Sequence, residues 1–155
     1  MFISTMSDAV ILYVEDSEDD RDLAERVFRR SGFSHELVFM RNGVEALEYL
    51  FAGKTSNPDR PPIPRVMLLD LNLPKLGGLE VLKCVRADAR THRLPVVILS
   101  SSDMQVDIAR CYALGANSYV RKPADFAEFA STLEHVGVYW LLVNQAPREG
   151  PEHES

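Results

Sequence analysis

The stretch RVMLLDLNLPKLGG, residues 65–78, begins as an apolar run and places a single acid, Asp70, where that run ends. A short, continuous apolar run favours a β-strand that is buried on both faces. Burying a carboxylate without a partner is costly, so an acid at this point needs a compensating group or a function. Asp70 is therefore the first candidate functional residue, and the rest of the chain is interpreted from it.

The composition bounds the class of protein. The chain has 155 residues, enough for one domain with a core, and carries a formal net charge of −6. That charge argues against a sequence-independent nucleic-acid binder, which needs a basic face. No apolar run approaches a membrane span, and residues 1–8 do not resemble a secretory signal. Cys84 and Cys111 fit free thiols in a reducing compartment. These features together predict a cytoplasmic protein without membrane attachment.

Apolar runs and helical periods alternate five times along the chain. This alternation predicts an α/β fold, a doubly wound parallel sheet with helices on both faces. The domain should span residues 9–143, with flexible termini at 1–8 and 144–155 and a proline-containing loop at 52–65. The expected strands are 9–14, 36–40, 66–69, 95–99 and 118–121, and the expected helices are 17–31, 43–51, 79–85, 106–114 and 125 to about 143.

Polar residues follow four of the five expected strands. In an open α/β sheet, functional groups gather beyond the carboxyl ends of the strands. Carboxylates, hydroxyls and one ammonium group should therefore meet at one edge of the sheet. They are Glu15 and Asp16 after the first strand, Asp70 and Asn72 after the third, Ser100, Ser101 and Ser102 after the fourth, and Lys122 after the fifth.

Clustered carboxylates repel one another unless a cation compensates them, and oxygen ligands suit Mg²⁺. Asp16, and Glu15 through a water molecule, would hold this metal. Asp70 lies between the acid pair and Lys122, so it is the best-placed nucleophile towards phosphorus. The Lys122 ammonium and the Ser100 hydroxyl could hold phosphoryl oxygens, with the backbone N–H of Ser101 as a further donor.

These motifs together resemble the receiver domain of two-component response regulators. The resemblance rests on Glu15–Asp16, Asp70, Ser100 and Lys122–Pro123, with Ser100 and Lys122 lying 30 and 52 residues after Asp70. It implies a flavodoxin-like five-stranded sheet in the order 2-1-3-4-5 with five helices. It also implies dependence on Mg²⁺ and phosphorylation of Asp70 by a histidine kinase.

The same resemblance assigns roles to the other residues. Asn72 would give its backbone carbonyl to Mg²⁺, Ser100 would be the switch hydroxyl and Tyr119 the switch aromatic. Lys122 would bind the phosphoryl group, and the Lys122–Pro123 bond would be cis. The protein would not be a conventional enzyme but a phosphoacceptor that promotes its own phosphorylation and dephosphorylation.

A closer resemblance is to the single-domain regulators paired with cyanobacterial and bacterial phytochromes. It rests on the block LLDLNLPKLGGLEVL at residues 68–82, the long loop before the third strand, and YWL at residues 139–141. It implies that the partner is a phytochrome kinase. A regulator without an output domain would signal through a changed surface or a dimer.

Two other classes use a similar site. A hydrolase of the haloacid-dehalogenase type also has a strand-end aspartate nucleophile with Mg²⁺, but it needs a second acid two positions later. Asn72 stands there and cannot do acid–base work. A degenerate receiver acting only as a binding module would not need the complete set of acids and Lys122.

The last helix carries an apolar stripe that suggests a homodimer. Its residues step by three and four positions, as in a heptad seam, although a helix covering a sheet shows the same stripe. Gly137 is expected to interrupt the helix and angle its end outward, which favours the dimer. The stripe comprises Phe126, Phe129, Leu133, Val136, Trp140 and Val143, with Tyr139 and Leu142 as a second edge.

Overall fold

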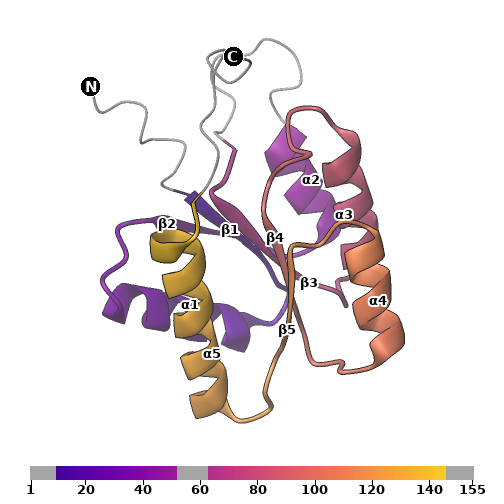
Figure 1. The fold of residues 1–155 in the computed structure, drawn as a ribbon. Helices are drawn as coiled ribbons and strands as arrows, with labels where there is room; N and C mark the ends of the chain where they lie inside the picture. The colour runs from indigo at the N-terminus through magenta and orange to yellow at the C-terminus, as the bar shows by residue number, and fades with distance from the viewer. Residues whose placement is uncertain (1–9, 52–62, 146–155) are drawn as a thin grey trace, which may run out of the picture.

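The computed structural model describes residues 10–51 and 63–145, in which five parallel strands form one sheet (Figure 1). The strand order is β2-β1-β3-β4-β5, which confirms the predicted flavodoxin-like topology. The predicted tail at residues 1–8, most of the predicted tail at 144–155 and most of the proline-containing loop lie outside the described residues, whereas residues 144 and 145 are described. The strands are β1 (Val10–Val14), β2 (Glu36–Met40), β3 (Val66–Asp70), β4 (Val96–Ser100) and β5 (Ser118–Arg121).

The helices cover both faces of the sheet, with α1 and α5 on one face and α2, α3 and α4 on the other (Figure 1). Every residue of the three central strands is buried, which explains why their sequences are nearly continuous apolar runs. The helices are α1 (Glu18–Arg30), α2 (Gly43–Phe51), α3 (Gly78–Ala87), α4 (Gln105–Ala113) and α5 (Phe126–Val138). Within the described residues, no helix is long and apolar enough to cross a membrane.

The apolar stripe of α5 packs mainly on the sheet. Phe129, Leu133 and Val136 are buried in the core formed with α1, so the middle of the predicted heptad seam is not available for a partner. The covering-helix interpretation of the stripe is therefore correct there, because a helix over a sheet buries one face. Among the described residues of α5 and the turn after it, the large apolar side chains that remain exposed are Phe126, Val138, Tyr139, Leu142 and Val143.

Gly137 does not interrupt the last helix, contrary to the prediction. It lies inside α5 and is buried against Phe33, so that a Cβ atom there would come within 2.6 Å of the Phe33 ring. The ring itself packs edge-on against Phe28. The glycine thus serves close packing between α5 and the segment after α1. The helix widens only at its end, in a π-helical turn over Tyr139–Val143.

The connection from β3 to α3 holds Asp70 in place. The N–H of Gly78 donates a 3.0 Å hydrogen bond to the carbonyl of Leu71, and the backbone at Gly78 lies directly against the carbonyl oxygen of Asp70. A Cβ atom at Gly78 would overlap that oxygen and lie 2.9 Å from the Cα of Leu71. Because both neighbours are backbone atoms, neither can move without shifting the end of β3.

We expect Gly78→Ala to lower the free energy of unfolding by about 2–3 kcal/mol, because the new methyl group overpacks the β3–α3 junction. The matched control is Gly77→Ala, where the nearest atom to a Cβ is 3.8 Å away. Chemical denaturation of both variants tests the argument. Equal stabilities of the two variants would show that the junction is not tightly packed.

Candidate functional site

The carboxyl ends of β1 and β3 bring the predicted acids together. Glu15 and Asp16 follow β1 and Asp70 ends β3, and one oxygen from each of the three carboxylates lies within 4.8 Å of the others. Glu15 and Asp70 are buried, whereas Asp16 is exposed. Such a set of hard oxygen donors fits a divalent cation of the Mg²⁺ type.

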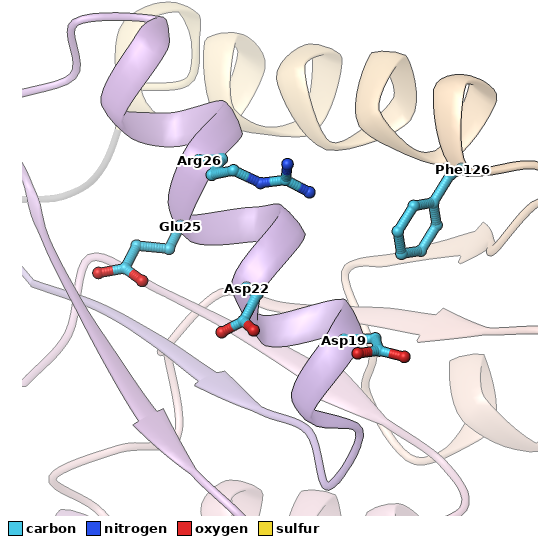
Figure 2. A pocket seen from close by; sticks show the side chains of 5 residues that line it. All are labelled: Asp19, Asp22, Glu25, Arg26 and Phe126. Carbon is cyan, nitrogen blue, oxygen red and sulfur yellow. The ribbon is translucent and has the colours of Figure 1, made fainter.

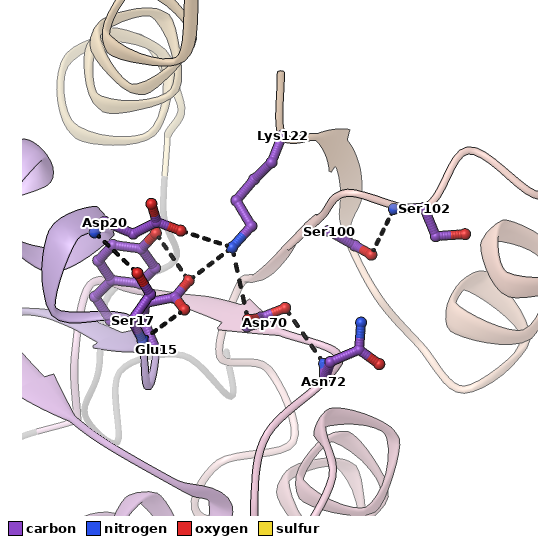
Figure 3. Close-up of polar contacts among 9 residues, drawn as sticks. Glu15, Ser17, Asp20, Asp70, Asn72, Ser100, Ser102 and Lys122 are labelled. Carbon is purple, nitrogen blue, oxygen red and sulfur yellow. Dashed lines mark hydrogen bonds and ion pairs between the residues drawn. The ribbon is translucent and has the colours of Figure 1, made fainter. Parts of the chain in front are cut away.

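Lys122 follows β5 and extends into this cluster (Figure 3). Its Nζ atom lies 2.9 Å from Oε1 of Glu15, 3.0 Å from Oδ2 of Asp20 and 3.6 Å from Oδ2 of Asp70. The ammonium also lies 5.9 Å from the centre of the Phe129 ring. These carboxylates raise the pKa of Lys122 above its ordinary value, although burial opposes them. The lysine is therefore a permanent cation that compensates part of the negative charge.

Glu15 is the most deeply buried acid of the site, with 1% of its surface exposed. The backbone N–H of Ser17 donates a 3.0 Å hydrogen bond to Oε2, and the Tyr13 hydroxyl donates to Oε1 over 3.4 Å. Burial, and secondarily the charge of Asp70, raise the pKa of Glu15 to about 7, against the opposing effect of Lys122. Ionising this carboxyl is thus costly in the absence of a further cation.

Asp70 lies at the centre of the arrangement and is only 6% exposed. The backbone N–H of Asn72 donates to its Oδ1 over 3.3 Å. Burial raises the pKa of Asp70, while Lys122 and the Asn72 hydrogen bond lower it. Lys122 and the Asn72 N–H therefore stabilise the ionised carboxylate that a nucleophile must present.

The ends of β4 and β5 are tied to each other beside the acids. Ser100 is fully buried, and its Oγ accepts a hydrogen bond from the N–H of Ser102 at 3.1 Å (Figure 3). The Tyr119 hydroxyl donates a 2.8 Å bond to the carbonyl of Ser102, and the Lys122 N–H donates to the carbonyl of Ser100 at 2.7 Å. Ser101 is exposed in the loop after β4.

The prediction of a cis Lys122–Pro123 bond is wrong, since this peptide bond is trans. The lysine is directed into the site without it, because the Lys122 N–H is fixed on Ser100 and the side chain is held by carboxylates. Seven of the eight predicted site residues nevertheless lie around the carboxyl ends of the strands, and the eighth, Tyr119, lies within β5 with its hydroxyl on the loop after β4. The eight are Glu15, Asp16, Asp70, Asn72, Ser100, Ser101, Tyr119 and Lys122.

The sequence interpretation missed two side chains that contact the site. Tyr13 precedes Glu15 by two positions, so strand alternation places both on one face of the sheet, which is a signal that could have been used. Asp20 lies in the first turn of α1, where an acid is ordinarily explained by the helix dipole alone. Its contact with Lys122 joins residues 102 positions apart and could not be inferred locally.

A separate hollow of about 350 Å³ lies between α1 and the start of α5 (Figure 2). Its lining contains the carboxylates of Asp19, Asp22 and Glu25, one guanidinium from Arg26, and the ring of Phe126. The excess of negative charge disfavours a phosphate-bearing ligand there. The acid cluster with Lys122, rather than this hollow, is therefore the candidate phosphoryl site.

A parallel sheet in this order, with an aspartate at a strand end, neighbouring acids and a lysine, is the arrangement expected of a receiver domain. Comparison with known proteins gives the same class. Residues 11–134 match the response regulator receiver domain family. The chain belongs to this family. It is thus a receiver of two-component signalling, in which a kinase phosphorylates the receiver, and the hydrolase and degenerate-module interpretations are not favoured.

Within the family, the chain is similar to regulators associated with phytochromes. It is 35% identical to the response regulator Rcp1 of Synechocystis over 85% of this chain and 88% of that protein. The phosphorylated cyanobacterial phytochrome response regulator RcpA is 36% identical, with a TM-score of 0.81 over 90% of this chain and 99% of that one. A Mn²⁺-bound form of Rcp1 is 35% identical, with a TM-score of 0.80 over 90% and 99% of the two chains. The chain is also 38% identical to the probable methanogenesis regulatory protein FilR2 of Methanothrix harundinacea, over 89% of this chain and 87% of that protein.

The raised pKa of Glu15 predicts a pH dependence of stability. In metal-free buffer the free energy of unfolding should fall by on the order of 1–2 kcal/mol as the pH rises from about 5 to about 7.5. The reason is that the folded protein retains a proton on Glu15 in this window, whereas the unfolded chain has already lost it. Denaturation at several pH values measures the slope. Glu15→Gln should be less pH-dependent, and an identical slope in both proteins would contradict the assignment.

Proposed function

We propose that Asp70 accepts a phosphoryl group from a histidine kinase. The observation that carries the proposal is the position of the Asp70 carboxylate, which is buried between the Glu15–Asp16 pair and the Lys122 ammonium. The Lys122 Nζ atom lies 3.6 Å from Oδ2 of Asp70. In the transfer, a carboxylate oxygen of Asp70 bonds to phosphorus while the P–N bond of phosphohistidine breaks. The electron pair of that bond remains on the imidazole nitrogen, which then takes up a proton.

The remaining residues would hold the phosphoryl oxygens. Lys122 is a fixed cation beside Asp70, and its ammonium would pair with one phosphoryl oxygen as the negatively charged group moves from the histidine to Asp70. The Ser100 hydroxyl and the Ser101 N–H come from the neighbouring strand end, since β3 and β4 are paired with Asp70 opposite Leu99. They would donate to the other oxygens.

Mg²⁺ is the metal that this donor set fits. Asp16, Asp70 and the backbone carbonyl of Asn72 would bind it, with Glu15 acting through a water molecule. When bound, it neutralises charge that develops on the phosphoryl oxygens. The proposal is supported by the clustering of the three carboxylates and by the existence of a Mn²⁺-bound form of the similar protein Rcp1.

Phosphorylation would be transmitted through Ser100 and Tyr119. The Ser100 hydroxyl now accepts the Ser102 N–H, and a turn towards the phosphoryl group would remove that bond. The Tyr119 hydroxyl bonds to the carbonyl of the same Ser102, so a shift of the loop would release the ring. The surface formed by α4 and β5 would change as a result. Ser100, Tyr119 and the loop between β4 and α4 would thus form a two-state element whose equilibrium depends on the charge at Asp70.

The kinase partner is proposed to be a phytochrome, acting in the cytoplasm. The support is the similarity to RcpA, whose name associates it with a cyanobacterial phytochrome, and to the bacteriophytochrome response regulator AtBRR, which is 40% identical to this chain. The receiver domain is proposed to extend over residues 9–143. Its output would be a changed surface or a dimer.

Asp70→Asn should abolish acid-labile, hydroxylamine-sensitive phosphate after incubation with acetyl phosphate and Mg²⁺, because an amide is not a nucleophile towards phosphorus. Radiolabel incorporation measures the loss. Asp103→Asn is the matched control, since Asp103 is an exposed acid in the loop after β4. This variant should incorporate as much phosphate as the wild type, because Asp70 is intact. Labelling of the Asp70 variant at the wild-type level would overturn the assignment.

The exposed end of the last helix is the proposed dimer contact. Tyr139 and Leu142 are 47% and 62% exposed, and Val143 adjoins them in the same turn. The Arg65 side chain donates hydrogen bonds to the carbonyls of Trp140 and Asn144, which fixes the turn to the start of β3. A fixed apolar surface is better suited to self-association than a fraying helix end.

Replacing both Tyr139 and Leu142 by alanine should shift the protein from dimer to monomer in sedimentation at micromolar concentration, since the buried apolar area is lost. Tyr112→Ala on α4 removes a tyrosine of similar exposure, 50%, and should leave the dimer intact. The dimer proposal is wrong if the wild-type protein is monomeric with and without phosphorylation, or if the double variant dimerises as well as the wild type.

A further inference from the structure

We propose that Asp20 is a positioning residue that holds Lys122 in a resting position and competes with the phosphoryl group on Asp70 for its ammonium. The inference rests on the proposed function of Asp70 and concerns how long, and how tightly, a phosphoryl group is held there. It assigns a role to an acid that neither the motif nor the dipole of α1 requires.

The distances place Lys122 closer to Asp20 than to Asp70. Its Nζ is 3.0 Å from Oδ2 of Asp20 and 2.9 Å from Oε1 of Glu15, but 3.6 Å from Oδ2 of Asp70. Figure 3 shows the ammonium between the three carboxylates, with Asp20 approaching from α1. The ammonium carries three N–H donors, and two of them are already used before any phosphoryl group is present.

Asp20 is fixed in this position by the start of α1. Its backbone N–H donates to Oγ of Ser17, the residue that caps the helix, at 3.2 Å. The Ser17 N–H in turn donates to Oε2 of Glu15. The two carboxylates that hold Lys122 are therefore joined through one serine, and they form a preorganised pair rather than a chance surface contact.

The contact is also shielded from water. The side chains of Lys122 and Asp20 are 13% and 20% exposed, and the Phe129 ring lies beside the ammonium. Ion pairs that are partly excluded from solvent are screened less than exposed ones. Moving Lys122 from Asp20 towards a phosphoryl group consequently costs free energy, which the new interaction with the phosphoryl group must offset.

Removing the charge of Asp20 should therefore favour the phosphorylated state. Asp20→Asn keeps the shape of the side chain but weakens its hold on Lys122 and removes one negative charge that would repel phosphoryl oxygens. The same substitution should lower the stability of the resting protein, because the ion pair and a charge at the N-terminus of α1 are lost. Opposite effects on stability and on phosphoryl binding are therefore diagnostic of the competition. A purely structural role of Asp20 predicts lower stability without stronger phosphoryl binding.

The test is a titration with BeF₃⁻, a phosphoryl mimic, at saturating Mg²⁺, followed by the amide NMR signal of Asn72. Asp20→Asn should bind about threefold to fivefold more tightly than the wild type. Asp20→Glu retains the charge and should stay close to wild type. Asp19→Asn is the matched control, because it removes an exposed charge of the same first turn that has no contact with Lys122 in the described structure.

Equal or weaker binding by Asp20→Asn would overturn the inference. So would an equal gain in Asp19→Asn, which would show that general electrostatics rather than the hold on Lys122 is responsible. A wild-type protein that shows no BeF₃⁻ response would instead contradict the proposed function of Asp70, and the inference would fall with it. The two failures are thereby distinguished within one experiment.

Discussion

The whole site depends on one ammonium group placed among carboxylates. Without Lys122, the buried acids Glu15 and Asp70 would repel each other in a region from which water is largely excluded, at a cost of several kcal/mol. With it, the negative charge is reduced but not cancelled, because Asp16 and Asp20 add further carboxylates. The residual negative charge would favour a divalent cation at this edge of the sheet, as the proposed function requires.

The packing of the sheet makes this balance possible. The buried central strands fix where each chain segment emerges, and the tight β3–α3 junction at Gly78 fixes the backbone of Asp70 itself. The Lys122 N–H is anchored on the carbonyl of Ser100, so the lysine and the end of β4 move together. A rigid core therefore supports a cluster in which the Lys122 ammonium lies nearer to Glu15 and Asp20 than to Asp70.

The fold and the gathering of most candidate site residues at one edge of the sheet could be predicted from the sequence, because strand ends are visible as the limits of apolar runs. The proximity of Asp70 and Lys122 follows from this pattern. The contact of Asp20 could not be predicted in this way, because its partner comes from the other end of the chain. Gly137 was misread, because a glycine in a helix indicates weakness unless a neighbour such as Phe33 occupies the space of its missing Cβ. The apolar stripe of α5 could not by itself tell a sheet from a partner.

The contact between Glu15 and Lys122 joins residues 107 positions apart. A contact between residues so far apart in the chain forms slowly, because closing the intervening loop costs conformational entropy. During synthesis, β1 and β3 leave the ribosome well before β5, so a growing chain carries the acids without their ammonium. Phosphoryl acceptance would then have to await the last strand, and chains that are truncated or incompletely folded would be excluded from signalling by the order in which the sheet is completed.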